Sequence, residues 1–185
     1  MHGELEAVFK LLDSAGPGRP LTQPSGCDMA AEYEESSMAL WRTTPDLGRL
    51  NAQQRNTIGE QLDIRFEAVD DSSLTASMAV DSRTHQPYGL LHGGASVVLA
   101  ETLGSVASYL CIDSSTHYCV GLEVNANHLR GLRSGRVTGV ARAVHVGRST
   151  HVWDIRLHGE DGKPSCIARL TVAVMALGEQ PPGVR

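Results

Sequence analysis

The sequence predicts an α+β fold in which a mostly antiparallel sheet packs around one long buried helix. Residues 62–80 alternate apolar and polar side chains in two runs, as half-buried strands do. Residues 93–111 are apolar or small and neutral at every position except Glu101, which is typical of a helix enclosed by protein. Four more strand-like runs follow, and strands joined by short turns pair antiparallel.

The first 37 residues differ in composition from the rest of the chain. Their seven acidic and two basic side chains give a net charge of −5, which equals the charge of the whole 185-residue chain. The run SAGPGRPLTQPSG is typical of a flexible link. We expect an acidic, flexible leader over 1–37 without a role in the chemistry, one domain over 38–177 and a tail over 178–185. Met38 is a candidate physiological start.

The chain carries no sign of export or of a membrane span. Its N-terminus is acidic where a secretory signal is basic, and it lacks a long apolar core segment. The longest apolar window contains Glu101 and has no basic flanks. We therefore expect a cytoplasmic protein, and we interpret Cys27, Cys111, Cys119 and Cys166 as reduced thiols, since they form no CxxC pair.

The domain opens with a helix and a hairpin. TTPDLGRLNA predicts a short helix with Thr44 as its N-cap and Pro45 at the first helical position. LDIRFEAV and SLTASMAV predict two strands, over 62–69 and 73–80, with DDS as the turn between them.

The long helix and the remaining strands follow. The small residues of the helix allow a sheet to curl tightly around it. The pair Asp161 and Gly162 marks a tight turn before the last strand. The four predicted strands cover residues 118–130, 135–148, 151–159 and 165–177.

Glu101 is the one charged side chain of the long helix. A buried charge is costly, so such a carboxylate is paired, raised in pKa, or placed at a cleft for chemistry. Gly93 and Gly94 begin the helix, where unpaired N–H groups and the positive end of the helix dipole converge. This end can hold a developing oxyanion, or the two glycines simply allow a tight turn.

Gly93 and Glu101 are separated along the helix. Eight positions correspond to about 12 Å at 1.5 Å per residue, which is too far for both groups to act on one carbonyl. A second copy of the chain must then supply one of them. Two antiparallel helices across a two-fold axis place the N-terminus of each opposite the Glu101 of the other, which predicts two identical sites per dimer.

The stretch DSRTHQPYGLLHGGASVVLAETLGSVASYLC strongly resembles the hot-dog-fold thioesterases. The resemblance is to the branch that contains the 1,4-dihydroxy-2-naphthoyl-CoA thioesterase of menaquinone biosynthesis and the thioesterase that proofreads aryl carrier protein in enterobactin synthesis. It continues through GLEVNANHLR, HVGRSTHVW and ARLTVAV, and covers about residues 38–177. It implies a curved antiparallel sheet around the central helix, homodimers that share a continuous sheet, and a homotetramer.

The resemblance assigns roles to five residues of the motif. Glu101 is the catalytic carboxylate, which attacks the thioester carbonyl or activates a water molecule. The N–H of Gly93 polarises the carbonyl, Gln86 and His92 orient the thioester or the water, and Ser105 lies beside the reacting groups. Without the resemblance, Gln86 is a turn residue, His92 a helix cap and Ser105 a small packing residue.

Five arginines and no acidic residue occur between residues 124 and 153. This pattern indicates a local anion site, or else scattered and solvated strand ends. Coenzyme A carries three phosphates, which suit arginine. In the resembling family its nucleotide end lies on segments that match HLRG and HVGRST. The implied binding set is His128, Arg130, His145, Gly147, Arg148, Ser149 and Thr150.

Thioester chemistry suits these residues, because a thiolate leaves without strong acid assistance and a carboxylate with an oxyanion donor can suffice. The chain has no GxSxG motif and no HExxH spacing, so we expect neither a serine triad nor a metal, and no cofactor beyond the CoA of the substrate. We expect an acyl-CoA thioesterase for aryl groups such as 1,4-dihydroxy-2-naphthoyl or hydroxybenzoyl.

Three alternatives remain open from the sequence. The chain could proofread mischarged aryl carrier protein, bind acyl-CoA without catalysis, or act as a hot-dog hydratase, although the spacing of Glu101 from HGG disfavours the last. The sequence leaves open the acyl group and the acyl carrier. No contact with nucleic acid or with a membrane is expected.

Overall fold

The computed structural model describes residues 40–178. The predicted leader over 1–37, the candidate start at Met38 and the predicted tail beyond Gly178 lie outside these residues. The helices of the described part are α2 (Leu47–Ala52), α3 (Ile58–Gln61) and α4 (Gly93–Leu110). The strands are β1 (Arg65–Val69), β2 (Ser73–Ala79), β3 (His85–Gln86), β4 (Leu90–Leu91), β5 (His117–His128), β6 (Arg136–Val146), β7 (Thr150–Gly159) and β8 (Pro164–Ala176).

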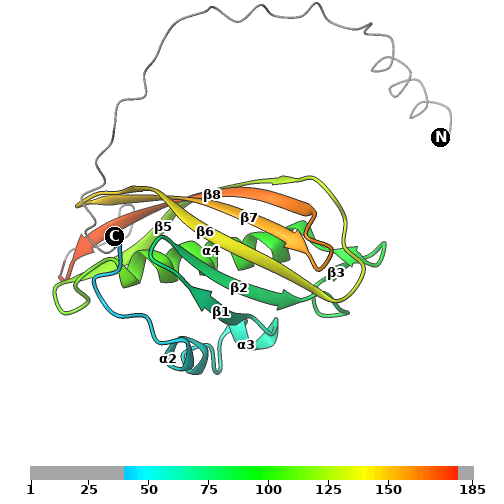
Figure 1. Cartoon of the computed structure of the whole chain (residues 1–185), viewed down its shortest axis with the longest axis horizontal. Coiled ribbons are helices and arrows are strands. Elements are labelled where there is room, and N and C mark those ends of the chain that lie inside the picture. The colour runs from blue at the N-terminus through cyan, green and yellow to red at the C-terminus, as the bar shows by residue number, and fades with distance from the viewer. Residues whose placement is uncertain (1–39, 179–185) are drawn as a thin grey trace, which may run out of the picture. The chain divides into compact units, whose positions relative to one another are not determined.

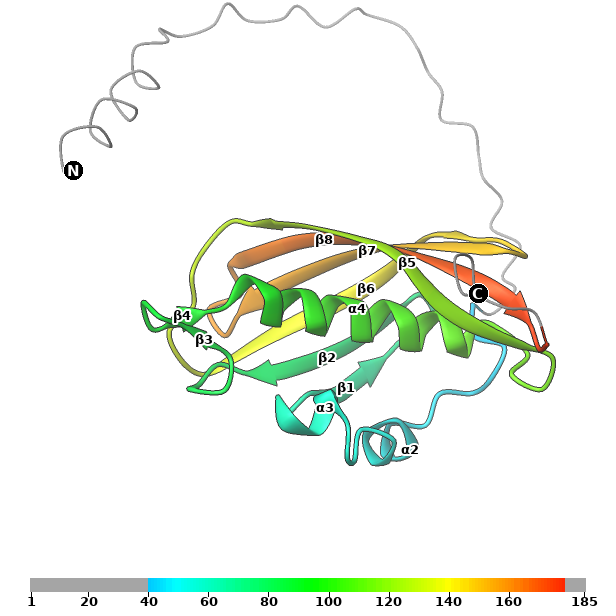
Figure 2. The same cartoon turned by 180° about the vertical axis from the view of Figure 1, so that it is seen from behind.

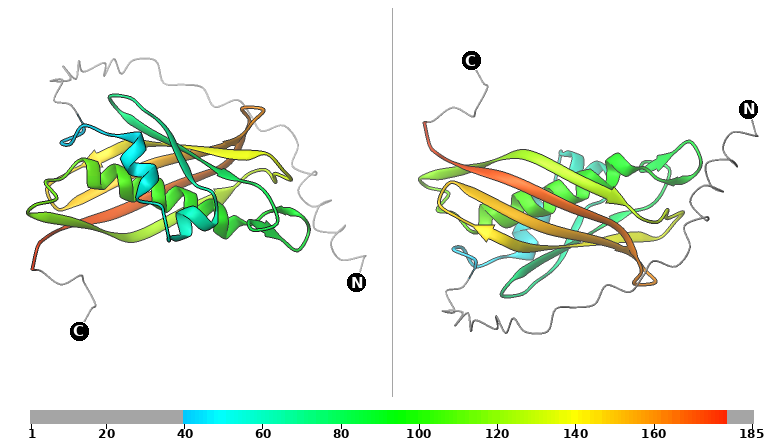
Figure 3. Two further views of the ribbon diagram at one scale, coloured as in Figure 1. Left: turned by 90° about the horizontal axis from the view of Figure 1, so that it is seen from below. Right: turned by 90° about the horizontal axis from the view of Figure 1, so that it is seen from above.

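One six-stranded antiparallel sheet forms the body of the domain, with the strand order β1-β2-β6-β7-β8-β5. The sheet curves over α4, which runs along its inner face (Figures 1 and 2). Figure 3 shows the same arrangement from below, with α4 in front of the sheet, and from above, with the sheet in front. The predicted α+β fold, a curved antiparallel sheet around one helix, is confirmed.

The core lies between α4 and the inner face of the sheet. On β7 the side chains alternate, so that Trp153, Ile155 and Leu157 are buried against the helix. The Trp153 indole N–H donates a hydrogen bond of 2.7 Å to the buried Ser108 hydroxyl of α4. A Cβ on Gly104 would lie 2.5 Å from Leu170 Cδ2, so a larger residue there would require the Leu170 side chain to shift.

The predicted cap of the first short helix is wrong. α2 begins at Leu47, and Asp46 is the N-cap, because its carboxylate accepts a hydrogen bond from the Arg49 N–H at 3.1 Å. Thr44 and Pro45 precede the cap. The structure also contains α3 and the small β3–β4 hairpin, which the sequence pattern does not indicate. The other predicted strands and the long helix are confirmed, and Gly162 of the predicted tight turn has a φ of +72°.

The expectation that α4 is enclosed on all sides is wrong for a single chain. One face of the helix, which includes Leu99, Leu103 and Ala107, is buried against the sheet. The opposite face carries Glu101, which is exposed, and Ser105, which is half-buried. One chain therefore leaves an uncharged helix face, apart from Glu101, in contact with solvent.

Strand β5 lies at the edge of the sheet beside this open face. It is 12 residues long and pairs only with β8, along Gly121↔Val172 and neighbouring residues. A register shift between Gly121 and Glu123 leaves Leu122 as the extra residue of a bulge, and Leu122 is 51% exposed. A long edge strand with an exposed leucine is suited to pairing with another strand.

Three cysteines lie within the described residues, and all are free thiols. Cys111, at the end of α4, and Cys119, on β5, are half-buried and pack against the core. Burial raises the pKa of Cys111 to about 12, with a smaller contribution from the nearby Cys119 thiol, and burial raises the pKa of Cys119 to about 11. Cys27 lies outside the described residues.

These raised pKa values predict slow alkylation of Cys111 and Cys119. Only the thiolate reacts, and its population at pH 8 falls tenfold for each unit by which the pKa rises. Iodoacetamide at pH 8 should therefore label Cys119 about a hundredfold and Cys111 about a thousandfold more slowly in the folded protein than in urea. Peptide mass spectrometry after timed labelling measures the two rates, and equal rates in the folded and unfolded protein would contradict the prediction.

Among residues 40–178, no helix is both long enough and apolar enough to cross a membrane.

Candidate active site

The N-terminus of α4 presents a free hydrogen-bond donor. His92 is the N-cap, and its Nδ1 accepts a hydrogen bond of 2.8 Å from the Gly94 N–H. The Ala95 and Ser96 N–H groups both donate to the His92 carbonyl, at 3.0 and 3.2 Å. Within the described residues, the Gly93 N–H has no acceptor. It points from the positive end of an 18-residue helix and can therefore stabilise an oxyanion.

The capping bond fixes the tautomer of His92. Because its Nδ1 accepts a hydrogen bond, a neutral imidazole carries its proton on Nε2. The side chain is exposed and makes no other hydrogen bond within residues 40–178. His92 is thus the helix cap that the sequence analysis gave as its alternative role. Its Nε2–H group remains available as a second donor at the same end of the helix.

Gln86 lies beside this end of the helix on the β3–β4 hairpin. Its Oε1 accepts a hydrogen bond of 2.8 Å from the Tyr88 N–H, which fixes the orientation of the amide. The turn has Gly89 at a φ of +71°, a conformation that favours glycine. The Gln86 amide NH₂ group has no partner within the described residues, so it can donate to a carbonyl or to a water molecule.

A pocket of about 340 Å³ opens at this point. It brings together Gln86, Gly93 and His128, which comes from the end of β5. A Cβ on Gly93 would lie 2.8 Å from His128 Nε2, so the imidazole packs directly against the glycine. The remaining lining residues are Leu90, Leu91, Ser96, Leu129, Arg130, Gly131 and Ser165.

Glu101 lies two turns further along α4, outside this pocket. Its side chain is exposed and makes no hydrogen bond or ion pair within residues 40–178. The carboxylate lies over β5, because a Cβ on Gly121 would be 2.9 Å from Glu101 Oε1. Ser105 follows one turn later on the same face of the helix. A charged group held free of partners above an edge strand is open to a ligand or to a second chain.

The structure divides the five predicted catalytic residues into two groups. Gln86, His92 and Gly93 lie together at the start of α4, whereas Glu101 and Ser105 lie further along the helix. The two groups are about 12 Å apart by the helical rise. Within one chain they do not form a single site.

The predicted CoA-binding residues are also divided. His128 and Arg130 lie at the pocket, where β7 ends at Gly159 and Arg130 Nη2 would lie 3.2 Å from a Cβ on Gly159. His145, Gly147, Arg148, Ser149 and Thr150 lie at or near the β6–β7 turn, and β7 begins there. Figure 2 shows this turn at the end of the sheet opposite β3 and β4. The two groups cannot meet within one chain.

The arginine-rich stretch is partly committed to ion pairs. Arg130 pairs with Asp161 at 2.7 Å, and Arg136 pairs with Asp63 at 2.7 Å. Arg142 donates to the Ser72 hydroxyl. Arg133 and Arg148 are exposed and have no acidic partner within residues 40–178. The five arginines therefore do not form one anion site. This agrees with the alternative interpretation, in which they lie at scattered strand ends.

Two residues of the site escaped sequence reasoning. Gly121 leaves room for the Glu101 carboxylate, and a glycine inside a strand is the signal that could have indicated a close approach. Ser165 lines the pocket at the start of α4 and is only 4% exposed, yet its hydroxyl has no partner among the described residues. No pattern in the sequence marks it.

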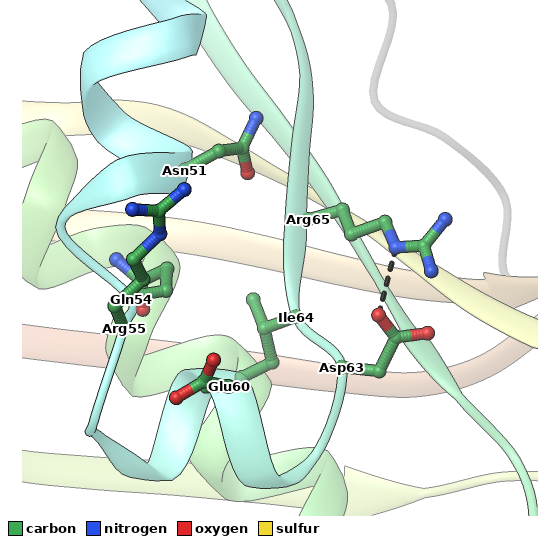
Figure 4. A pocket seen from close by; sticks show the side chains of 7 residues that line it. All are labelled: Asn51, Gln54, Arg55, Glu60, Asp63, Ile64 and Arg65. Atoms are coloured by element: carbon green, nitrogen blue, oxygen red, sulfur yellow. Dashed lines mark hydrogen bonds and ion pairs between the residues drawn. The ribbon is translucent and has the colours of Figure 1, made fainter.

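A second hollow, of about 330 Å³, lies between α2, α3 and β1 (Figure 4). Most of its polar side chains have hydrogen-bond partners, chiefly backbone groups and Arg136 outside the hollow. The Asn51 side-chain amide donates a hydrogen bond to the Phe66 carbonyl and accepts one from the Phe66 N–H. Burial raises the pKa of Asp63, but hydrogen bonds from Arg136 and Arg65 lower it by more, so that this carboxylate stays ionised. The hollow contains none of the predicted site residues.

Comparison with known proteins connects this geometry to an activity. A model of the family described as "Thioesterase superfamily" matches residues 88–166. The 1,4-dihydroxy-2-naphthoyl-CoA hydrolase of Escherichia coli K12 is 51% identical over 136 residues, which are 74% of this chain and 99% of that protein. The proofreading thioesterase EntH of Cronobacter turicensis is 45% identical over 136 residues, which are 74% of this chain and 98% of that protein.

Solved structures agree with the sequence relatives. A mutant thioesterase of Pseudomonas aeruginosa is 79% identical and superposes with a TM-score of 0.74, covering 75% of this chain and 99% of the solved one. A thioesterase of Haemophilus influenzae is 45% identical with a TM-score of 0.73, covering 76% of this chain and 98% of the solved one.

Proposed function

This chain belongs to the thioesterase superfamily and has its hot-dog fold, and from this premise we propose that it hydrolyses aryl-CoA thioesters with Glu101 as the reacting carboxylate. It is a thioester hydrolase, as its relatives are. The observation that carries the proposal is an exposed carboxylate without a partner on the same helix whose first N–H group lacks an acceptor. These are the two groups that hydrolysis of a thioester needs.

The reaction converts a thioester and water into a carboxylic acid and a thiol. The Gly93 N–H, at the positive end of α4, holds the carbonyl oxygen as negative charge develops on it. The Glu101 carboxylate attacks the carbonyl carbon, or it removes a proton from the water molecule that attacks. In the first case the C–S bond breaks, the thiolate leaves, and the acyl group forms a mixed anhydride with Glu101, which water then hydrolyses to the free acid and the Glu101 carboxylate. In the second case the C–S bond breaks as the thiolate leaves, the oxygen of water ends in the acid, and the proton taken by Glu101 passes to the thiolate.

Two chains complete one site in this proposal. Antiparallel pairing of β5 with the β5 of a second copy extends the sheet and covers the open face of α4. The two helices then run antiparallel, so that the Glu101 of each chain faces the Gly93 of the other. This pairing accounts for a helix face that is almost free of charge in a chain that leaves it exposed.

The same pairing unites the two groups of CoA-binding residues. It places the β6–β7 turn of one chain at the end of the sheet where the other chain has its α4 N-terminus. Arg148, which is exposed and unpaired, is then available for a phosphate of CoA. Two such dimers form the homotetramer that we expect.

The proposed role of Arg148 predicts a change in KM. Arg148→Ala should raise KM for benzoyl-CoA about fivefold to tenfold and leave kcat within about twofold, because an exposed phosphate contact contributes to binding and not to the transition state. Steady-state kinetics measure both constants. Arg55→Ala removes an exposed arginine at the other hollow and is the control. A fall in kcat without a rise in KM would contradict the assignment.

The 1,4-dihydroxy-2-naphthoyl-CoA hydrolase supports an aromatic acyl group. Both 1,4-dihydroxy-2-naphthoyl-CoA hydrolase and EntH are named for thioester hydrolysis or proofreading, and the first is the more similar of the two to this chain. The second candidate function is proofreading, which the name of EntH gives for that protein, and aryl carrier protein is the substrate that we expect for it. A protein that only bound acyl-CoA would have no use for the exposed Glu101 carboxylate.

A panel of thioesters tests the proposed function. Benzoyl-, 4-hydroxybenzoyl-, 1,4-dihydroxy-2-naphthoyl-, phenylacetyl- and octanoyl-CoA are compared with benzoyl aryl carrier protein, and the release of free thiol is followed. We expect the highest kcat/KM for an aryl-CoA. The highest value for the carrier protein would support proofreading instead, and the absence of turnover with every thioester would refute the proposed function.

A further inference from the structure

The pocket at the start of α4 contains a buried polar group that the proposed reaction does not use. Ser165 is 4% exposed, and its hydroxyl has no hydrogen-bond partner within residues 40–178. Buried hydroxyl groups are nearly always paired, and leaving one unpaired destabilises the protein. Because Ser165 also lines the pocket, a bound ligand or a water molecule can supply the partner.

The backbone of Ser165 is held in place. Its carbonyl accepts hydrogen bonds from the Leu129 N–H at 2.8 Å and from the Arg130 N–H at 3.2 Å. The register of β7 and β8 shifts at this point, since Leu157 pairs with Cys166 while His158 pairs with Pro164. Ser165 is thus the bulged residue at the start of β8, and bulges re-aim side chains beside functional sites. Its hydroxyl is uncommitted, and rotation about the Cα–Cβ bond re-orients it.

The contacts around Ser165 show in which order the polar groups follow one another along the pocket. Gly93, with the free N–H, touches the His128 imidazole. Ser165 comes next, bonded to the Leu129 and Arg130 backbone. At the far side lies the Arg130 guanidinium, which donates to Asp161 at 2.7 Å and to the Lys163 carbonyl at 3.1 Å.

A ligand that matches this order has a carbonyl at one end, followed by an apolar chain with an internal polar group. The leucines that line the pocket, Leu90, Leu91 and Leu129, suit the apolar chain. A serine hydroxyl donates and accepts, so it can bind either the N–H or the carbonyl of an amide. The phosphopantetheine arm of an acyl thioester has this sequence of groups.

We propose that Ser165 binds an amide of the phosphopantetheine arm, so that the enzyme recognises its substrate by the arm as well as by the acyl group. This inference rests on the proposed function, because it assumes that Gly93 holds the thioester carbonyl. CoA and carrier proteins share the arm. Ser165 therefore favours neither carrier over the other.

Ser165→Ala tests the inference with thioesters that differ only in the arm. Benzoyl-CoA, benzoyl aryl carrier protein and benzoyl-N-acetylcysteamine contain an amide near the sulfur, whereas S-butyl thiobenzoate contains none. We expect kcat/KM to fall about fivefold to twentyfold for the first three thioesters, which is the effect of losing one hydrogen bond to a neutral group. For S-butyl thiobenzoate we expect a fall of less than twofold. Ser134→Ala, at an exposed serine outside the pocket, is the control.

The pattern of losses separates binding from a structural role. Equal losses with all four thioesters, or no loss with any, would overturn the inference. The Kd of CoA, measured by calorimetry for wild type and Ser165→Ala, gives a readout that does not depend on turnover. If wild type binds CoA without hydrolysing thioesters and the variant binds it more weakly, the proposed function fails, while the contact between Ser165 and the phosphopantetheine arm is supported. An unchanged Kd, or no binding of CoA by wild type, overturns the inference.

Discussion

Glu101→Gln is expected to lower kcat for aryl-CoA hydrolysis by about 10²- to 10⁴-fold while the fold remains intact. Glutamine keeps the size of the side chain but is neither a nucleophile nor a base. The carboxylate is exposed and has no partner within residues 40–178, so its removal leaves no buried group unpaired. Thiol release measures the rate, and the thermal unfolding midpoint measures the stability.

A matched control separates the chemistry from the change of charge. Asp71→Asn removes one negative charge from the exposed turn between β1 and β2, which lies outside the proposed site. Its activity should equal that of wild type within about twofold. If Glu101→Gln keeps more than a tenth of the activity, or loses it together with the folded state, Glu101 does not carry the reaction.

The strands and the long helix could be predicted because their side-chain periods are long and regular. β7 alternates between buried and outward residues over ten positions, and α4 runs for 18 residues without a charge other than Glu101. The elements that escaped prediction are short. α3 has four residues, and β3 and β4 have two each, too few for a period to appear.

The error at the first helix has a local cause. Thr44 before Pro45 has the sequence signature of a cap, but the Asp46 carboxylate reaches the N–H three residues later and satisfies the helix start. Both residue types cap helices well. Which of them does so depends on how the preceding segment is held, since the Arg42 and Thr43 N–H groups both donate to the Leu110 carbonyl at the end of α4, and that is a tertiary property.

The candidate catalytic residues and their separation along the helix could be predicted from the sequence, but the partners of the arginines could not. Arg136 was one of five arginines that indicated an anion site, and its charge is used by Asp63, 73 positions earlier in the chain. Arg130 is likewise used by Asp161. The composition of a thirty-residue segment does not reveal acidic partners that lie elsewhere in the chain. The unpaired hydroxyl of Ser165 depends in the same way on a contact between distant strands.

Two inactive variants are expected to restore activity when they share a dimer. Gly93→Pro removes the proposed oxyanion donor, because proline has no N–H. Proline is well tolerated at the first position of a helix, and His92 already has the extended conformation, ψ 134°, that a residue before proline prefers. The ring must displace the exposed His128 side chain, which packs against Gly93. Alone, this variant should lose about 10²- to 10³-fold in kcat.

Co-expression of Gly93→Pro with Glu101→Gln should recover about a quarter of the wild-type activity per dimer. Random pairing makes half of the dimers mixed, and each mixed dimer has one site with both defects and one site with none. Activity no greater than the sum of the two variants expressed separately would contradict a site shared between chains. Recovery requires that the intact Gly93 of one chain and the intact Glu101 of the other meet at one carbonyl. Two groups that lie about 12 Å apart on a single helix can do so only across the paired β5 strands.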